Sequence, residues 1–443
     1  MAINRVTPTD RERRFEAHEL FFSTTDRKGH ILSGNEVFSR ISGWDRDELI
    51  GAPHNIIRHP DMPRAVFQVV WDYLLAGHPV AGYVKNMAKN GDAYWVMATI
   101  VPHGDGFLSV RLKPSGPHWE AVQAVYPIVR ATELELEEQG MPVREVIEHS
   151  VAQLVEILQG AGFPTYTDFM RAALPTELQL RGQAIAGRPH VGPTSGGLYH
   201  LGKHLDDLFA SLDHYLDTHE ALSKGLVGVR NFAEDIRLGA MNALLAATHL
   251  DGQAVTLGTV ADLMGASARS VAEQVGVLTD EAAPIMSVLH DLAFSVSLAK
   301  VQVDLARFFA EEIQASEGGH AEHGGDLRDI VGLVTGEVQQ VMRVRGDIEA
   351  QLMPLRGSIG QLEERIKVLR SLDVAGRIEI ARIPGADRVV TLFDQIRTEL
   401  GTVGERITAM HAAVDRQEAA IDVDALARDA AAATDEADQL AAV

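Results

Sequence analysis

The chain contains no cysteine among its 443 residues. A disulfide framework, a thiolate zinc site, a cysteine-ligated iron–sulfur cluster and a catalytic thiol are therefore excluded. Long apolar runs are also lacking, because no stretch approaches the roughly 20 residues that a membrane-spanning helix needs, and the first residues have no apolar core of signal-peptide length. We therefore expect a cytoplasmic protein without membrane insertion.

Basic residues are scarce relative to acidic ones, with 40 Lys and Arg against 62 Asp and Glu and a formal net charge of −22. This balance disfavours binding to nucleic acid, so we expect protein partners instead. The sequence has no P-loop, dinucleotide fingerprint, kinase nucleotide box or HExxH motif, and we expect no enzymatic activity. His200 and His204 lie one helical turn apart without an evident third ligand, so we expect no metal site.

After a short cap segment, residues 1–18, the chain shows two kinds of sequence pattern. Residues 19–113 contain the alternating runs ELFFSTT, HILSGN, YWVMATIVP and FLSVRL with Gly and Asp-Gly between them. This pattern predicts an α+β domain with antiparallel strands and short helices. Residues 114–193 lack it and predict an irregular helical connector.

The remaining sequence predicts an all-α bundle of helical hairpins with coiled-coil packing, so the fold class is multidomain. Apolar residues recur with a 3.5-residue period from Leu205, which keeps one stripe facing a partner helix. We expect a first hairpin over 194–316 that turns at residues 251–253, and a second over 327–420. The Gly-rich residues 317–326 predict a flexible linker, and the Ala/Asp-rich tail 421–443 is expected to fray.

A polar cluster in residues 53–96 points to a ligand pocket of a sensor. Arg58, His59, Asp61 and Asn86 are crowded together with several aromatic residues in one short α/β unit. A surface turn stabilised by local ion pairs is the alternative for the charged residues. Core packing is the alternative for the tryptophans.

Residues 20 to 112 resemble a PAS domain of the aerotaxis-receptor type, on the phrases GAPHNIIRHPDMPRAVFQVVW and VKNMAKNGDAYWVMATIVP. The resemblance implies non-covalent FAD whose redox state is reported to the motility apparatus. One residue departs from that pattern, because Val80 replaces the aromatic residue of the usual PWxG motif. The cofactor-binding residues that the resemblance implies are Asn35, Arg58, His59, Asp61, Asn86, Tyr94 and Trp95.

Residues 236 to 264 are similar to the signalling tip of methyl-accepting chemotaxis receptors. Asn242, the alanine run and Val-Ala-Asp at 260–262 agree with that tip, whereas Ala246 and His249 replace its Glu and Arg. The resemblance implies a homodimer whose partners are a chemotaxis histidine kinase and a coupling protein. A second partial match at residues 378–382 suggests that one chain supplies both hairpins of a four-helix bundle.

The sequence therefore predicts a sensor of aerotaxis or chemotaxis type. Its PAS domain would detect a redox or oxygen-related state through FAD and pass it to the bundle. Two alternatives stay open. One is a scaffold or interaction protein whose empty PAS domain serves dimerisation or docking, and the other is a haem sensor with His54 or His59 as axial ligand.

Overall fold

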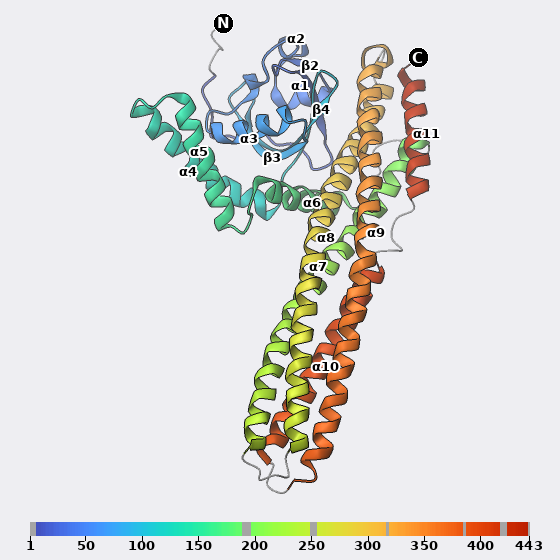
Figure 1. The fold of residues 1–443 in the computed structure, drawn as a ribbon. Helices are drawn as coiled ribbons and strands as arrows, with labels where there is room; N and C mark the ends of the chain where they lie inside the picture. The colour runs from blue at the N-terminus through green and yellow to red at the C-terminus, as the bar shows by residue number, and fades with distance from the viewer. Residues whose placement is uncertain are drawn as a thin grey trace. The chain divides into compact units, whose positions relative to one another are not determined.

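The computed structural model describes residues 6–187, 196–248, 255–315, 319–383, 387–416 and 423–441 (Figure 1). The chain divides into two compact units. The first comprises Met1–Phe209, Ala293–Val341 and Val423–Val443, and the second comprises Ala210–Leu292 and Met342–Asp422.

A five-stranded antiparallel sheet forms the centre of the first unit, in the order β2-β1-β5-β4-β3. This confirms the predicted α+β domain with antiparallel strands. Short helices occupy the segment between β2 and β3. The bounds are β1 Phe21–Asp26, β2 Ile31–Gly34, α1 Glu36–Ser42, α2 Arg46–Leu49, the 3-10 helix η1 His54–Ile57, α3 Arg64–Leu75, β3 Val80–Met87, β4 Ala93–His103 and β5 Gly106–Leu112.

The core of this domain lies between the sheet and the short helices. Phe21 of β1 stacks on Phe38 of α1 with ring centroids 6.3 Å apart, and Tyr94 of β4 packs beside them. The core residues Tyr94, Val96 and Ala98 stand at alternate positions of β4, which point to one face of a sheet. Their burial holds α1 against the sheet and removes large apolar surfaces from water.

Three helices follow the sheet and form the connector, namely α4 Pro117–Glu138, α5 Val143–Gly160 and α6 Tyr166–Ile185. Tyr166 donates its hydroxyl hydrogen to the carbonyl of Ala81 on β3 at 3.0 Å. A Cβ at the next residue, Gly82, would overlap that hydroxyl, so β3 and α6 approach closely only because a glycine stands there.

Glu177 of α6 adds a second anchor, because its buried carboxylate accepts from the Tyr83 hydroxyl at 2.8 Å and from the N–H groups of Ser115 and Gly116. The latter two donors lie at the start of α4, where N–H groups lack helical partners. Glu177 therefore holds β3, the start of α4 and α6 together.

Five further helices complete the described chain: α7 Gly197–Thr248, α8 Val255–Ala315, α9 Gly319–Ile380, α10 Asp387–Arg416 and α11 Val423–Ala441. Where the side chains are described, the predicted 3.5-residue stripes are largely buried, as Leu205 and Ile236 of α7 and Val271 of α8 illustrate. The expected coiled-coil packing therefore agrees with the burial pattern of these helices.

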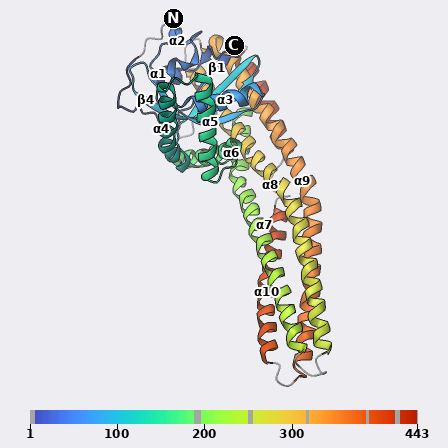
Figure 2. The same ribbon diagram turned by 60° about the vertical axis from the view of Figure 1, so that its left-hand side comes forward.

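In the second unit, parts of α7, α8, α9 and α10 run side by side in both views (Figures 1 and 2). Gln274 of α8 donates to the Ser358 carbonyl of α9 at 3.4 Å, and Arg377 of α9 donates to the Phe393 carbonyl of α10 at 3.2 Å. A Cβ at Gly225 of α7 would overlap the sulfur of Met410 on α10, which shows close contact between the first and last of these helices. The four segments thus form a bundle within one chain, as the sequence hypothesis requires.

Two expected boundaries differ from the structure. The residues expected to form a flexible linker, 317–326, are helical from Gly319 onward, since α9 begins there. Of the tail expected to fray, the described residues 423–441 form α11, in which Leu426, Ala430 and Ala433 are buried. Small apolar side chains every three or four residues give α11 a stripe that packs, which the low complexity of the segment concealed. The expected turn at 251–253 lies outside the described residues.

Helix α8 is long and apolar enough, by length and composition alone, to cross a membrane, and no other helix in the described ranges passes that test. Of the apolar window, 65% is buried inside the structure. A buried core helix passes the same test, so the finding agrees with the core position of α8. The absence of membrane insertion stays a prediction.

Candidate functional site

A cavity of about 350 Å³ lies between the sheet, η1 and α3 of the first unit. Volumes of about 300–1,000 Å³ with mostly apolar walls and a few polar groups are typical of small-molecule sites. Its apolar walls come from α3 and from the strands β3, β4 and β5. The lining residues are Thr25, Lys28, Gly29, Pro53, His54, Asn55, Arg58, Phe67, Val70, Trp71, Leu74, Val84, Asn86, Val96, Ala98, Ile100, Phe107, Ser109 and Arg111.

Arg111 of β5 is a buried residue in the wall of this cavity. Its guanidinium donates to the Ser23 hydroxyl at 2.9 Å and to Nε2 of His54 at 2.6 Å, and it lies 5.1 Å from the ring centre of Phe38. Burial lowers the pKa of Arg111 to about 10, so the group is still a cation at neutral pH. Burial and the nearby Arg111 charge lower the pKa of His54 to about 3, so this imidazole is neutral and Nε2 can accept the bond.

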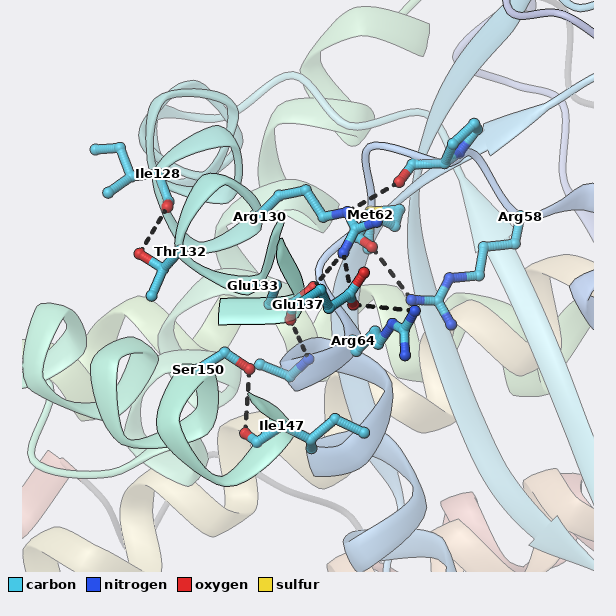
Figure 3. A network of polar contacts seen from close by, with 12 residues as sticks. Arg58, Met62, Arg64, Ile128, Arg130, Thr132, Glu133, Glu137, Ile147 and Ser150 are labelled. Atoms are coloured by element: carbon cyan, nitrogen blue, oxygen red, sulfur yellow. Dashed lines mark hydrogen bonds and ion pairs between the residues drawn. The ribbon is translucent and has the colours of Figure 1, made fainter. Parts of the chain in front are cut away.

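Arg58 also lines the cavity, and it belongs to the network of polar contacts that includes Glu133 of the connector (Figure 3). Its guanidinium lies 4.0 Å from the ring centre of Phe67 and donates to the Met62 carbonyl at 3.2 Å. Burial lowers the pKa of Arg58 to about 10, while the negative charge of Glu133 acts in the opposite direction. The Arg58 cation at the cavity and the Glu133 carboxylate of the connector therefore interact electrostatically.

Glu133 of α4 is buried and caps the start of α3 (Figure 3). Its carboxylate accepts from the Ala65 N–H at 3.0 Å and from Arg130 at 2.9 Å. Ala65 is the second residue of α3, whose N-cap Pro63 makes no side-chain cap. Because the first N–H groups of a helix lack internal partners, Glu133 supplies an acceptor that α3 itself does not provide.

Of the seven residues predicted to bind a cofactor, Arg58 and Asn86 line the cavity. Asn35 does not, because it is the N-cap of α1 and accepts from the Phe38 N–H. Its amide nitrogen donates to the Leu20 carbonyl at 3.2 Å and to Glu312 of α8 at 3.1 Å. Asn35 therefore joins the domain core to a long helix of the same unit.

Four predicted residues lie elsewhere. Asp61 is exposed and pairs with Lys85 at 2.6 Å, while Nδ1 of buried His59 accepts from the Asp61 N–H at 3.2 Å. Tyr94 belongs to the apolar core, and its buried hydroxyl has no partner among the described residues. Trp95 packs against Tyr126 of α4 with ring centroids 6.0 Å apart. The positions of Asp61 and Trp95 match the local ion pairing and the packing that were the alternatives from sequence.

Sequence reasoning missed Arg111, Lys28 and Asn55 as lining residues and considered His54 only as a haem ligand. A signal for Arg111 existed in the run FLSVRL, where a charged residue stands inside an otherwise apolar strand. Buried strands rarely contain an arginine without a specific role. For Lys28 and Asn55 the sequence offers no comparable signal, because turn residues of these types are common.

Comparison with known proteins adds independent evidence for this domain. Residues 31–107 match the family described as PAS fold. The chain is 43% identical over 114 residues to the aerotaxis receptor of Escherichia coli K12, which covers 25% of this chain and 22% of that protein. It is 30% identical over 82 residues to the biofilm dispersion protein BdlA of Pseudomonas aeruginosa, covering 18% and 20%.

The nitrogen fixation regulatory protein of Klebsiella pneumoniae is 29% identical over 87 residues, which covers 20% of this chain and 18% of that protein. The chain thus spans about a fifth of the length of these curated relatives. A crystal structure of a PAS domain from Colwellia psychrerythraea is 21% identical, covers 21% of this chain and 85% of that one, and has a TM-score of 0.19. Residues 31–107 are therefore a PAS domain similar in sequence to that of the aerotaxis receptor, and a long helical region follows it.

Proposed function

We propose that this PAS domain binds FAD in the cavity and passes the redox state of the cofactor to the helices that follow. The observation that carries the proposal is the cavity itself, with Arg58 and Asn86 on its wall and Arg58 linked electrostatically to Glu133 of the connector. The likeness to the aerotaxis receptor supports a signalling role of this type.

The lining residues fit a flavin by their chemistry. Trp71, Val84 and Ile100 belong to apolar walls suited to a planar ring, and the amides of Asn55 and Asn86 can both donate and accept. Exposed Lys28 at the rim suits a phosphate oxygen. When bound, FAD would supply the redox chemistry, because the chain contains no cysteine and no side chain that cycles between redox states at the cavity.

The signal would leave the domain by two contacts. A change of ligand charge beside Arg58 would change the interactions of Arg58 with the Met62 carbonyl and with Glu133. Because Glu133 accepts from the Ala65 N–H, the packing of α4 against α3 would change as well. The second contact is the hydrogen bond from Asn35 to Glu312 of α8, and Asn35 also caps α1, whose Phe38 stacks on Phe21. Each contact can bias a helix between two packings, which is the requirement for a switch.

The output would be a protein partner in the cytoplasm. The similarity of residues 236 to 264 to a chemoreceptor tip favours a chemotaxis histidine kinase or its coupling protein, with the chain acting as a homodimer. The net charge of −22 agrees with protein rather than nucleic-acid partners.

Haem has weaker support. Nε2 of His54 already accepts from Arg111 at 2.6 Å, so an iron would have to displace a buried guanidinium. His59 does not line the cavity, and its Nδ1 accepts from the Asp61 N–H.

An absorption spectrum of the purified full chain tests the proposal. The expected result is a two-banded flavin spectrum, with FAD released from the protein on denaturation. A Soret band would favour haem, and a colourless protein that stays colourless after incubation with FAD would favour the scaffold alternative. Arg58→Ala should weaken FAD retention, whereas Arg144→Ala, an exposed arginine on α5, should not.

A further inference from the structure

The charged residues that line the cavity all have one sign. Lys28, Arg58 and Arg111 are lining residues, and no Asp or Glu is found among the described residues of the wall. A low-dielectric cavity whose charges share one sign favours a ligand of the opposite charge. The lining therefore favours a negatively charged ligand, although most of the cavity wall is apolar.

Arg111 is the cation that most needs such a ligand. Arg58 has the carboxylate of Glu133 near it, and Lys28 is exposed to water. The guanidinium of Arg111 donates to the Ser23 hydroxyl, the Ser109 carbonyl and neutral His54, and none of these three groups carries a negative charge. A buried charge without a counter-charge is costly, and a bound anion would remove that cost.

The position of Arg111 in the cavity wall allows a bound anion to reach it. Arg111 lines the cavity, so a ligand that fills the cavity would reach its side chain. The guanidinium carbon of Arg111 lies 5.9 Å from the ring centre of Phe21 and 5.1 Å from that of Phe38, so both rings stabilise the cation by cation–π interaction. His54 stacks on Phe38 and fixes one N–H of the guanidinium by accepting from it.

We propose that the cavity selects a planar aromatic ligand that carries negative charge beside Arg111. Two sources share this chemistry: the ring of a bound flavin in a negatively charged state, and the carboxylate of a small aromatic acid. The first source rests on the function proposed above, whereas the second does not. Arg111 is then the specificity-determining residue, and Arg58 and Lys28 are the auxiliary cations.

The flavin source is tested on full-length protein that retains FAD. The midpoint potential of the bound FAD is measured by dye equilibration for wild type, Arg111→Met, Arg111→Gln and Arg111→Lys. Loss of the cation should lower the ratio of reduced to oxidised FAD at least tenfold, which is about 30 mV for a two-electron couple, and Arg111→Lys should retain most of the wild-type value.

Arg46→Met is the matched control, because Arg46 belongs to the same domain, donates to the Gly34 carbonyl and does not line the cavity. It should leave the potential unchanged. An unchanged potential in folded Arg111→Met and Arg111→Gln proteins would overturn the proposal for flavin, while the presence of FAD would leave the proposed function intact.

The aromatic-acid source is tested on protein that contains no FAD, with benzoate and its neutral analogue benzamide titrated by calorimetry. Wild type and Arg46→Met should bind benzoate about tenfold more tightly than benzamide, and Arg111→Met should lose this preference. Equal affinities in wild type, no binding of either probe, or a preference that survives in Arg111→Met would each overturn the proposal. A colourless protein with a clear benzoate preference would instead reject the FAD assignment and retain this one.

Discussion

Asn35 donates a hydrogen bond from its side-chain amide to Glu312 of α8 across 3.1 Å, and the amide oxygen of the same residue accepts from the Phe22 N–H at 3.2 Å. One buried side chain thus binds the first strand, caps α1 and holds a helix 277 residues away in sequence. The amide can do this because it both donates and accepts.

Asn35→Asp should weaken this attachment. An aspartate keeps the N-cap of α1 but places a second carboxylate against Glu312, so the two like charges repel. We expect faster amide hydrogen exchange in the part of α8 around Glu312 and a loss of about 1–3 kcal/mol in the free energy of unfolding. The double variant Asn35→Asp/Glu312→Gln should recover much of the protection, and no recovery would contradict the direct contact.

Glu133→Ala should destabilise the packing of the connector helix α4 against α3. The Ala65 N–H loses its acceptor and Arg130 loses a buried counter-charge, which together cost about 2–4 kcal/mol. Urea unfolding measures the change. Glu138→Ala, on an exposed position of the same helix, serves as control and should change the free energy by less than about 0.5 kcal/mol.

Gly82→Ala should force β3 and α6 apart. The added methyl overlaps the Tyr166 hydroxyl, and overpacking of this kind costs about 1–3 kcal/mol. Tyr166→Phe removes the overlapping oxygen together with its bond to the Ala81 carbonyl. The double variant should therefore be more stable than the sum of the single changes predicts. Simple additivity would show that the two residues do not touch.

Acid should destabilise the first unit through His54. Its pKa is about 3 in the folded chain, so between the ordinary value of 6.5 and about 3 the unfolded chain binds more protons. Stability contributed by neutral His54 is therefore full above pH 6.5 and is lost as the pH falls. Between pH 6.5 and 5 the loss should be about 1–2 kcal/mol, reduced because the ring borders an open cavity.

His54→Gln keeps an acceptor for Arg111 but does not titrate, so its unfolding free energy should depend less on pH in this window. His149→Gln, on an exposed position of α5, is the control and should retain the wild-type slope. Parallel slopes for wild type and His54→Gln would refute the neutral state of His54.

The sequence predicted the architecture well where local patterns are sufficient. Alternation in YWVMATIVP and FLSVRL predicted strands, and the 3.5-residue stripes beginning at Leu205 predicted packed helices. The glycine content of the EGGHAEHGGD segment suggested a linker, but α9 begins within it, at Gly319. Tertiary packing overrides such local preferences.

The candidate site was predicted less well, for a physical reason. A motif specifies which residue types are near one another in sequence, but not which side chains point into a cavity. Asn35 and Tyr94 point into the core, whereas Arg111 reaches the cavity from a strand that the motif does not include. Long-range contacts such as Glu133 with Ala65 leave no mark in a local pattern.

Hydrogen exchange of the full-length protein in its oxidised and chemically reduced states tests the central claim most directly. If the cavity holds a flavin that communicates with the helices, reduction should change exchange around Glu133 of α4 and Glu312 of α8, and Glu133→Ala should remove the change in α4. Identical exchange in both states, with the flavin spectrum confirming that reduction occurred, would contradict the account.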